Sequence, residues 1–581
     1  MNKPIPGIRF ENGEALIALW SPTCNNAAIL INQTEKLSLY KVDFGYWALN
    51  TRAIKPGDTY QFLLDDTPYP DPASLSQPDG VNGPSKALDL GPYQWKDRNW
   101  SNPPLEDYII YELHTGTFTP QGTFDGIADK LDYLKELGIT AIEIMPVAQF
   151  PGERNWGYDG VYPYAVQNSY GGAEGLMELV DACHQKGIAV ILDVVYNHLG
   201  PEGNYFASYG PYFTDKYHTP WGNAINFDDA WCDEVRHYFI ENALMWFRDF
   251  HIDALRLDAV HAIKDLSPKH ILQELKERTP KGHHLIIEFD LNDSRFIDPI
   301  KKGGFGMDAQ WIDEFHHALR VTAGGGQDGY YADFNGIVHL AKSYNSAYVY
   351  DGIYSPHRLK TFGIPAQDNP GNQFVVFSQN HDQVGNRMLG ERSSMLFSFE
   401  MQKLMAAAVM VSPFIPMLFM GEEWSAQEPF LYFVSHSDPD LIKAVRKGRK
   451  AEFAAFHQDG EAPDPQAKET FEQSKLDWQR IDYTMIDYYK NLIALRKQFP
   501  ALYQLNRKLV TTTINESDQT LLLERGDPHQ NISCLMNFSG ERHQTGVLSK
   551  LFDSADQRWN GPGSLKGYIQ PQSIIIYTNH V

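Results

Sequence analysis

The sequence is poor in cysteine, with only four among 581 residues: Cys24, Cys183, Cys232 and Cys534. They are scattered along the chain and show neither the pairing of a disulfide framework nor the spacing of a metal site. We therefore expect packed thiols in a reducing compartment, and neither a cofactor nor a catalytic metal ion.

Long hydrophobic runs are also absent, since no stretch approaches the roughly 20 apolar residues that a membrane helix needs. The first seven residues, Met1 to Gly7, lack the basic head and apolar stretch of a secretory signal. The expectation is a cytoplasmic protein that has no membrane partner.

Positive charge is scarce, because 50 Lys and Arg face 73 Asp and Glu and leave a formal net charge of −23. We identify no stretch of clustered Lys and Arg that offsets this charge locally, so a phosphate backbone would be repelled and no nucleic-acid partner is expected. A Walker-type phosphate loop is missing, and the adjacent pair His316-His317 lacks the i, i+4 spacing of a helical zinc site. A neutral substrate fits this composition better.

The length of the chain exceeds what one hydrophobic core usually supports, so several domains are expected. Short alternating segments broken by Pro, Gly and Asn predict a β-sandwich over residues 1–92, whose turn-rich tract Pro68 to Pro92 is interpreted as a linker. Similar stretches predict a second β-sandwich over residues 506–581.

Between these regions, over residues 93–505, apolar strands alternate with helical patterns. Leu176, Leu179, Val180 and Cys183 fall at i, i+3, i+4 and i+7, and Gly187 follows as a helix stop. Eight strand candidates predict an α/β fold, a closed (β/α)8 TIM barrel rather than an open doubly wound sheet. They are Tyr108–Tyr111, Ile142–Pro146, Val190–Val195, Ala254–Val260, Leu285–Phe289, Met307–Trp311, Phe374–Ser378 and Met417–Met420.

Polar residues gather where these strands end, which is where barrel enzymes place their catalytic groups. Arg256 and Asp258 lie two apart on one strand, so both side chains project to the same side. The guanidinium favours the ionised carboxylate, as a nucleophile requires. A buried structural salt bridge is the alternative interpretation of this pair taken alone.

Glu288 ends the next strand after the apolar run Leu285 to Ile287, so burial should raise its pKa and make it a proton donor. Asp258 and Glu288 then supply the two carboxyl groups that glycoside hydrolysis requires. Hydrolysis with retention of the anomeric configuration needs these groups to lie about 5 to 5.5 Å apart. Asp382 is a third acid that can hold sugar hydroxyls. For Asn197, a hydrogen bond near Asp258 is the simpler expectation, and a structural calcium ion the alternative.

Four of these strand ends, namely Asp193–His198, Arg256–His261, Glu288–Asp290 and Gln379–Asp382, resemble the conserved regions of the α-amylase superfamily, glycoside hydrolase family 13. The resemblance implies that Asp258 is the nucleophile, Glu288 the acid/base and Asp382 the stabiliser of the transition state. It also implies a substrate-binding set, which comprises Tyr158, Asp193, Asn197, His198, Trp221, Arg256, His261 and His381.

Segments outside these regions, among them Gln149–Tyr164, His218–Gly222 and Phe315–Leu319, look like those of the maltooligosyltrehalose trehalohydrolases. That resemblance implies hydrolysis of the α-1,4 bond next to a terminal trehalose. The substrate would be maltooligosyltrehalose, made by a partner synthase. Two positions depart from the expected pattern, because Phe289 replaces a small polar residue and Ile312 replaces Asn.

Two other functions stay open on the sequence alone. Glucan branching or debranching enzymes share an N-terminal sandwich and a similar Trp-Gly-Tyr segment. A non-catalytic glycan-binding protein on the same barrel is the alternative from another class. Such proteins generally lose one of the carboxylates, whereas this chain keeps Asp258, Glu288 and Asp382.

Overall fold

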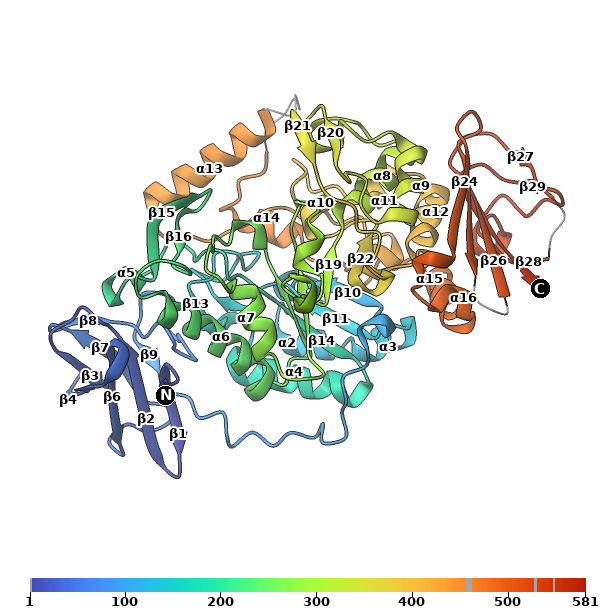
Figure 1. Ribbon diagram of the computed structural model, residues 1–581. Coiled ribbons are helices and arrows are strands. Elements are labelled where there is room, and N and C mark those ends of the chain that lie inside the picture. Colours follow the sequence, from blue (N-terminus) through green and yellow to red (C-terminus); the bar gives the residue numbers. More distant parts are fainter. Residues whose placement is uncertain (1–2, 455–461, 527–529, 547–548, 581) are drawn as a thin grey trace.

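A closed barrel of parallel strands forms the centre of the molecule, and β-rich regions flank it (Figure 1). The computed structural model describes residues 3–454, 462–526, 530–546 and 549–580. The eight strands pair in chain order, and each overlaps one predicted strand, so the predicted barrel is confirmed. They are β10 (Ile110–Leu113), β11 (Ala141–Ile144), β14 (Ala189–Val194), β17 (Ala254–Leu257), β18 (His284–Ile287), β19 (Ala309–Trp311), β22 (Phe374–Phe377) and β23 (Ile415–Phe419).

The barrel strands are buried along their whole length except His284, and helices cover them from outside. The predicted helix after β11 is α4 (Gly172–Lys186), and Gly187 ends it in the left-handed region with φ 71°. The longer helices around the barrel are α6 (Cys232–Asp249), α7 (Ile271–Arg278), α8 (Asp313–Thr322), α9 (Gly336–Ser346), α12 (Phe399–Met410) and α15 (Tyr483–Gln498).

The N-terminal region has two antiparallel sheets, as the alternating sequence pattern predicted. One has the order β1 (Gly7–Glu11), β2 (Glu14–Trp20), β6 (Tyr46–Thr51), β5 (Tyr40–Lys41). The other has the order β4 (Glu35–Ser38), β3 (Ala27–Ile31), β7 (Thr59–Leu64), β8 (Thr67–Tyr69), and β9 (Ser85–Lys86) also pairs with β7.

The interpretation of Pro68 to Pro92 as a linker is wrong. The end of β8 and all of β9 lie in this tract and pair with β7, and the Tyr60 hydroxyl donates to the buried Asp71 carboxylate at 2.7 Å. Proline and glycine set sharp turns here, but buried polar partners hold those turns against the sandwich.

The C-terminal region has a five-stranded antiparallel sheet and a small ribbon. The sheet order is β24 (Val510–Asn515), β25 (Thr520–Gly526), β26 (Gln530–Asn537), β30 (Ser573–His580), β28 (Lys550–Asp553), and the ribbon pairs β27 (His543–Gln544) with β29 (Tyr568–Ile569). The buried Arg525 joins this sheet to the barrel by donating to the carbonyls of Val411 and Ser412, each at 2.7 Å. The exact domain boundaries after residues 92 and 505 stay predictions.

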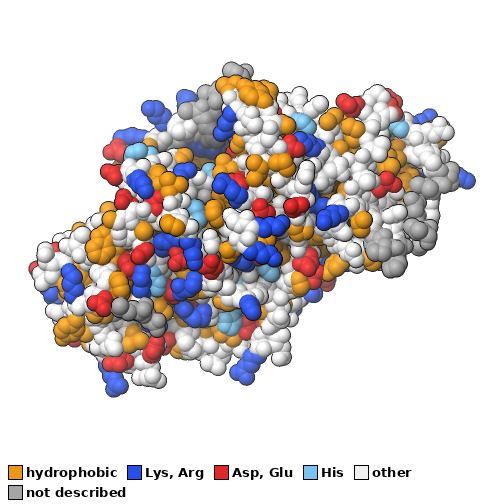
Figure 2. Space-filling model, in the orientation of Figure 1, with side chains coloured by type: hydrophobic (Ala, Val, Ile, Leu, Met, Phe, Trp, Pro, Cys, Tyr) orange, Lys and Arg blue, Asp and Glu red, His pale blue; other side chains and the backbone are white. Residues whose placement is uncertain are grey.

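The expectation that Lys and Arg are nowhere clustered is wrong. Helix α13 (Pro439–Ala454) carries five basic residues between Lys443 and Lys450. Part of this charge is compensated, for example by the 2.6 Å ion pair between Arg446 and Asp464. On the face in Figure 2, acidic and basic side chains are interspersed. Within the described ranges, the helices include none with the length and apolar character that crossing a bilayer requires.

Candidate active site

Asp258 and Glu288 lie side by side at the carboxyl ends of β17 and β18. Their preceding residues, Leu257 and Ile287, are register partners, and the Glu288 amide continues the ladder by donating to the Leu257 carbonyl at 3.0 Å. Because neighbouring strands are about 4.8 Å apart, this register brings two carboxyl groups to one point of the barrel mouth.

Arg256 is the charge centre beneath these acids. Its side chain is fully buried, and Nη1 lies 2.9 Å from Asp258 Oδ1 and 2.8 Å from Asp193 Oδ2, while the guanidinium stacks over Trp311 at 4.3 Å. Burial raises the pKa of Asp193 to about 7, against the opposing effect of Arg256. The guanidinium therefore compensates two carboxyl groups whose combined charge exceeds its own.

Asn197 holds the other side of Asp258. Its Nδ2 donates to Asp258 Oδ2 at 3.0 Å and to the Asp258 carbonyl at 2.8 Å, which confirms the expected hydrogen bond. With Arg256 on Oδ1, both carboxylate oxygens have a donor, so the orientation of the Asp258 side chain is fixed.

The carboxyl group of Glu288 is held differently from that of Asp258, and its side chain is 16% exposed. Burial raises its pKa to about 8; Arg256 opposes this shift and the charge of Asp258 adds to it. The Ala259 amide donates to Oε2 at 2.9 Å. Glu288 is thus mostly protonated at neutral pH, which confirms the expected pKa direction.

Asp382 lies in the first turn of α10 (His381–Gly385), directly after β22, and its side chain is 41% exposed. The neighbouring His381 is buried and pairs through Nδ1 with Glu112, while Nε2 lies 3.4 Å from Asp382 Oδ2. Desolvation opposes the charged ring, yet Asp382 and Glu112 raise the pKa of His381 to about 9. His381 is therefore a charged donor beside Asp382.

The rings of Tyr158, His198 and Trp221 lie beside the acids and are called the aromatic wall below. Tyr158 donates from its hydroxyl to Asp193 at 2.6 Å and stacks on the His381 ring. His198 contacts the Tyr158 carbonyl through Nε2 at 3.0 Å, and Trp221 stacks on His198 with ring centroids 4.5 Å apart. Trp221 is 49% exposed, so the wall extends to the surface.

His261, the last residue of the predicted set, lies on the short 3-10 helix Val260–Ala262, just beyond Asp258. Its Nδ1 is buried and has no hydrogen-bond partner among the described residues. Five others of the set are buried and bonded to protein groups, whereas Tyr158 and Trp221 keep exposed surface; the five are Asp193, Asn197, His198, Arg256 and His381.

The sequence analysis missed two acids of this site. Glu112 is the third residue of β10 and accepts from the His381 amide; the signal was a single charged residue in an otherwise uncharged barrel strand. Asp313, at the start of α8, is 3.2 Å from Gln383, and burial with the nearby Asp382 charge raises its pKa to about 7. Its signal was a carboxyl residue shortly after a barrel strand.

The two unusual positions are buried. Phe289 stacks on Phe296 with ring centroids 4.5 Å apart, and Ile312 is 2% exposed. Both line a small pocket that Asp313 and Arg358 also border. The residue directly after Glu288 therefore contributes an aromatic ring to the lining of this pocket.

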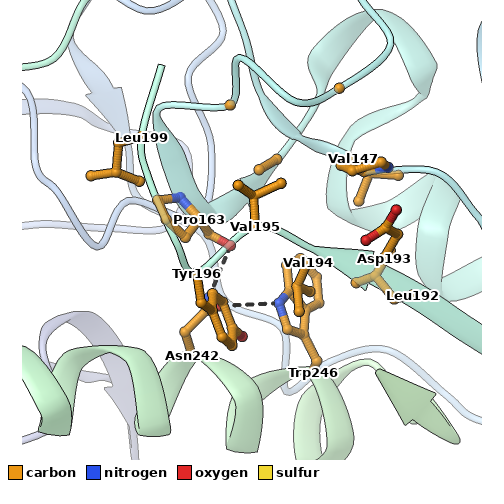
Figure 3. Close-up of a pocket in the computed structure, with 14 residues that line it drawn as sticks. Val147, Pro163, Leu192, Asp193, Val194, Val195, Tyr196, Leu199, Asn242 and Trp246 are labelled. Atoms are coloured by element: carbon orange, nitrogen blue, oxygen red, sulfur yellow. Dashed lines mark hydrogen bonds between the residues drawn. The ribbon is translucent and has the colours of Figure 1, made fainter. Parts of the chain in front are cut away.

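Behind the acids, helix α6 anchors the loop that follows β14. Figure 3 shows Asn242 pointing from α6 toward this loop, and it accepts from the hydroxyl of Tyr196 at 2.6 Å and from the indole of Trp246 at 3.2 Å. It also donates to the Pro163 carbonyl at 2.9 Å. One amide thus joins the loop after β14 to the strand β13 (Tyr162–Val166), which follows the loop that carries Tyr158.

Comparison with known proteins shows similarity over most of the chain. The model of the alpha-amylase catalytic domain matches residues 69–221. A malto-oligosyltrehalose trehalohydrolase from Saccharolobus solfataricus is 49% identical, with 87% of this chain and 88% of that protein covered. Another from Rhizobium sp. strain M-11 is 39% identical, with 93% of each covered. The crystal structure of a Salmonella typhimurium protein, provisionally described as an alpha amylase, superposes with a TM-score of 0.91 at 36% identity and covers 99% of both chains.

Proposed function

Because the chain belongs to the malto-oligosyltrehalose trehalohydrolase family, we propose that it hydrolyses the α-1,4 bond next to the terminal trehalose of maltooligosyltrehalose. The products are trehalose and a maltooligosaccharide. The observation that carries this proposal is the pair at the barrel mouth: Asp258, held between two donors, beside Glu288 with its pKa raised to about 8.

The proposed mechanism is a double displacement that retains the anomeric configuration. A carboxylate oxygen of Asp258 attacks the anomeric carbon, the bond to the leaving oxygen breaks, and Glu288 gives that oxygen its proton. Trehalose departs. Glu288 then takes a proton from water, whose oxygen attacks the same carbon and frees Asp258. The Ala259 amide occupies Oε2, which leaves Oε1 to carry the proton.

We assign substrate-binding or positioning roles to the remaining residues of the site. We assign Asp382 and charged His381 to the sugar hydroxyls next to the cleaved bond, where their hydrogen bonds strengthen as the ring flattens. Tyr158 and Trp221 offer faces on which sugar rings stack. His198 and His261 complete the substrate-binding set. Arg256, Asp193 and Asn197 act through their neighbours and are positioning residues.

We also propose a pathway partner and a cellular location for the enzyme. The substrate must come from a synthase that converts the reducing end of a glucan into trehalose, so such a synthase is the proposed pathway partner. A cytoplasmic location is proposed because all four cysteines are unpaired, as suits a reducing compartment.

The test is a product assay on maltotriosyltrehalose, in which trehalose and maltotriose should appear in equal amounts. Cleavage of ordinary maltooligosaccharides without trehalose release would overturn the proposal. Iodine staining of amylose and reducing-end release from pullulan would identify branching or debranching instead. Binding without any turnover would identify a glycan-binding protein.

A further inference from the structure

A second open groove, with a volume of about 840 Å³, lies between the N-terminal region and the barrel. One wall is the tract Pro78 to Asn82. The other walls come from residues 149–153 and 167–169 after β11, from Glu202 after β14, and from Ser435 and Ser437 after β23. Three walls therefore follow carboxyl ends of barrel strands, so the groove opens on the same side of the barrel as Asp258.

The walls of the groove are fixed to each other. The Tyr162 hydroxyl donates to the Val81 carbonyl at 2.8 Å, and Asn168 Nδ2 donates to the Pro78 carbonyl at 3.2 Å. The amide of Ser437 donates to Glu202 at 3.0 Å. These bonds join segments distant in sequence, so the groove is formed before any ligand arrives.

The lining mixes polar and apolar groups, and the described residues that form it carry no positive charge. It includes three carboxylates, Asp79, Glu153 and Glu202, besides several amides and serine hydroxyls. Anionic ligands would be repelled by these carboxylates. Sugar hydroxyls both donate and accept hydrogen bonds, so a neutral polyhydroxyl chain matches this mixture of acceptors and donors.

The side chain of His436 connects the groove to the loop that carries Tyr158. His436, between the groove-lining Ser435 and Ser437, has Nδ1 3.4 Å from Glu202 and Nε2 3.7 Å from Asp159. Since Asp159 directly follows Tyr158, the groove and the aromatic wall of the active site share one supporting loop.

We propose that this groove binds the distal glucose residues of a neutral α-1,4-glucan chain whose trehalose-bearing end lies at Asp258 and Glu288. The inference rests on the proposed function, because the groove holds the distal part of the substrate that the proposed reaction cleaves. Turnover at low substrate concentration then increases when the chain is long enough to enter the groove.

The test compares kcat/KM for maltosyltrehalose and maltohexaosyltrehalose in two groove variants, Glu153→Ala and Glu153→Trp. The Glu153 side chain is exposed, and its backbone amide donates to the Ser435 hydroxyl at 3.2 Å. Removing the carboxylate should lower the ratio of long to short substrate by about threefold. Filling the groove with indole should lower that ratio by about tenfold.

Glu516→Ala and Glu516→Trp are the matched controls, because Glu516 is exposed in the turn between β24 and β25 of the C-terminal sheet. Their ratio should equal that of the wild type. If Glu153→Trp does not fold, the double variant Asp79→Ala/Glu153→Ala replaces it. An unchanged ratio in the folded groove variants overturns the inference.

Titration of maltoheptaose into Asp258→Asn protein separates this inference from the proposed function. Added Glu153→Trp should weaken maltoheptaose binding severalfold and leave maltose binding at its original affinity. If no substrate yields trehalose, the proposed function fails, while this titration still decides whether the groove holds a glucan. Equal weakening of both sugars would overturn the groove assignment.

Discussion

The backbone amide of Ala259 donates to Oε2 of Glu288 at 2.9 Å from a residue whose φ is 42°. A left-handed backbone costs a residue with a Cβ roughly 1 to 2 kcal/mol. The turn directly after Asp258 therefore adopts an unfavourable conformation that directs its N–H toward the neighbouring acid. Asp258 and Glu288 are coupled through this single residue as well as through Arg256.

Substitution of Ala259 should separate backbone strain from catalysis. Glycine adopts φ 42° freely, so Ala259→Gly should change the free energy of unfolding by less than about 1 kcal/mol. Valine is β-branched, so Ala259→Val should lower that free energy by about 2 kcal/mol and also reduce kcat. Thermal denaturation and initial rates measure both effects. Equal stability and rates in the two variants would contradict the assigned strain.

The raised pKa of Glu288 predicts the alkaline limb of the rate profile. The proton donor is present below its pKa of about 8 and is lost as the pH rises through that value. We therefore expect kcat/KM to fall above about pH 8, by about tenfold per unit. Glu288→Gln should remove this limb and retain activity mainly on aryl glycosides with good leaving groups. A limb that persists in Glu288→Gln would assign it to another group.

Removal of the Asp258 carboxylate should abolish turnover. Asp258→Asn keeps the size of the side chain but loses the attacking charge, at a cost on the order of 8 kcal/mol or about a millionfold in rate. Single-turnover assays measure the rate, and maltoheptaose binding with circular dichroism checks that the site and fold remain. A variant with near-native rates would refute the nucleophile assignment.

A histidine at the opposite end of the barrel should make stability depend on pH. Burial opposes the charge of His184, but hydrogen bonds to Asp253 and Asp97, each at 2.9 Å, raise its pKa above 6.5. The protonated ring therefore stabilises the fold fully below pH 6.5, and this contribution is lost as the pH rises through the raised pKa.

His184→Gln should consequently lower the melting temperature more at about pH 6 than at about pH 9. The exposed His218 provides the matched control, and His218→Gln should have little effect at either pH. Thermal scans at both values measure the difference. A loss for His184→Gln that is the same at both pH values would show that packing, rather than charge, explains the role of His184.

The barrel and its central acids were predictable because local signals reported them. Each of the eight strands is mainly apolar, Asp258 and Glu288 directly follow β17 and β18, and Asp382 lies five residues beyond the end of β22. The tract after Pro68 was misinterpreted because turn residues look alike in linkers and in packed turns. Its burial depends on partners such as Tyr60, which the local sequence does not identify.

The sequence alone determined that Asp258 and Glu288 end consecutive barrel strands, because strand order and the residues at strand ends are local properties of the chain. Only the tertiary structure decided what surrounds them. Glu112 and His381 are 269 positions apart and meet because β10 and α10 lie at the same barrel mouth. The groove beside the N-terminal region likewise depends on distant segments, since it forms only where residues 78–82 meet the loops of the barrel.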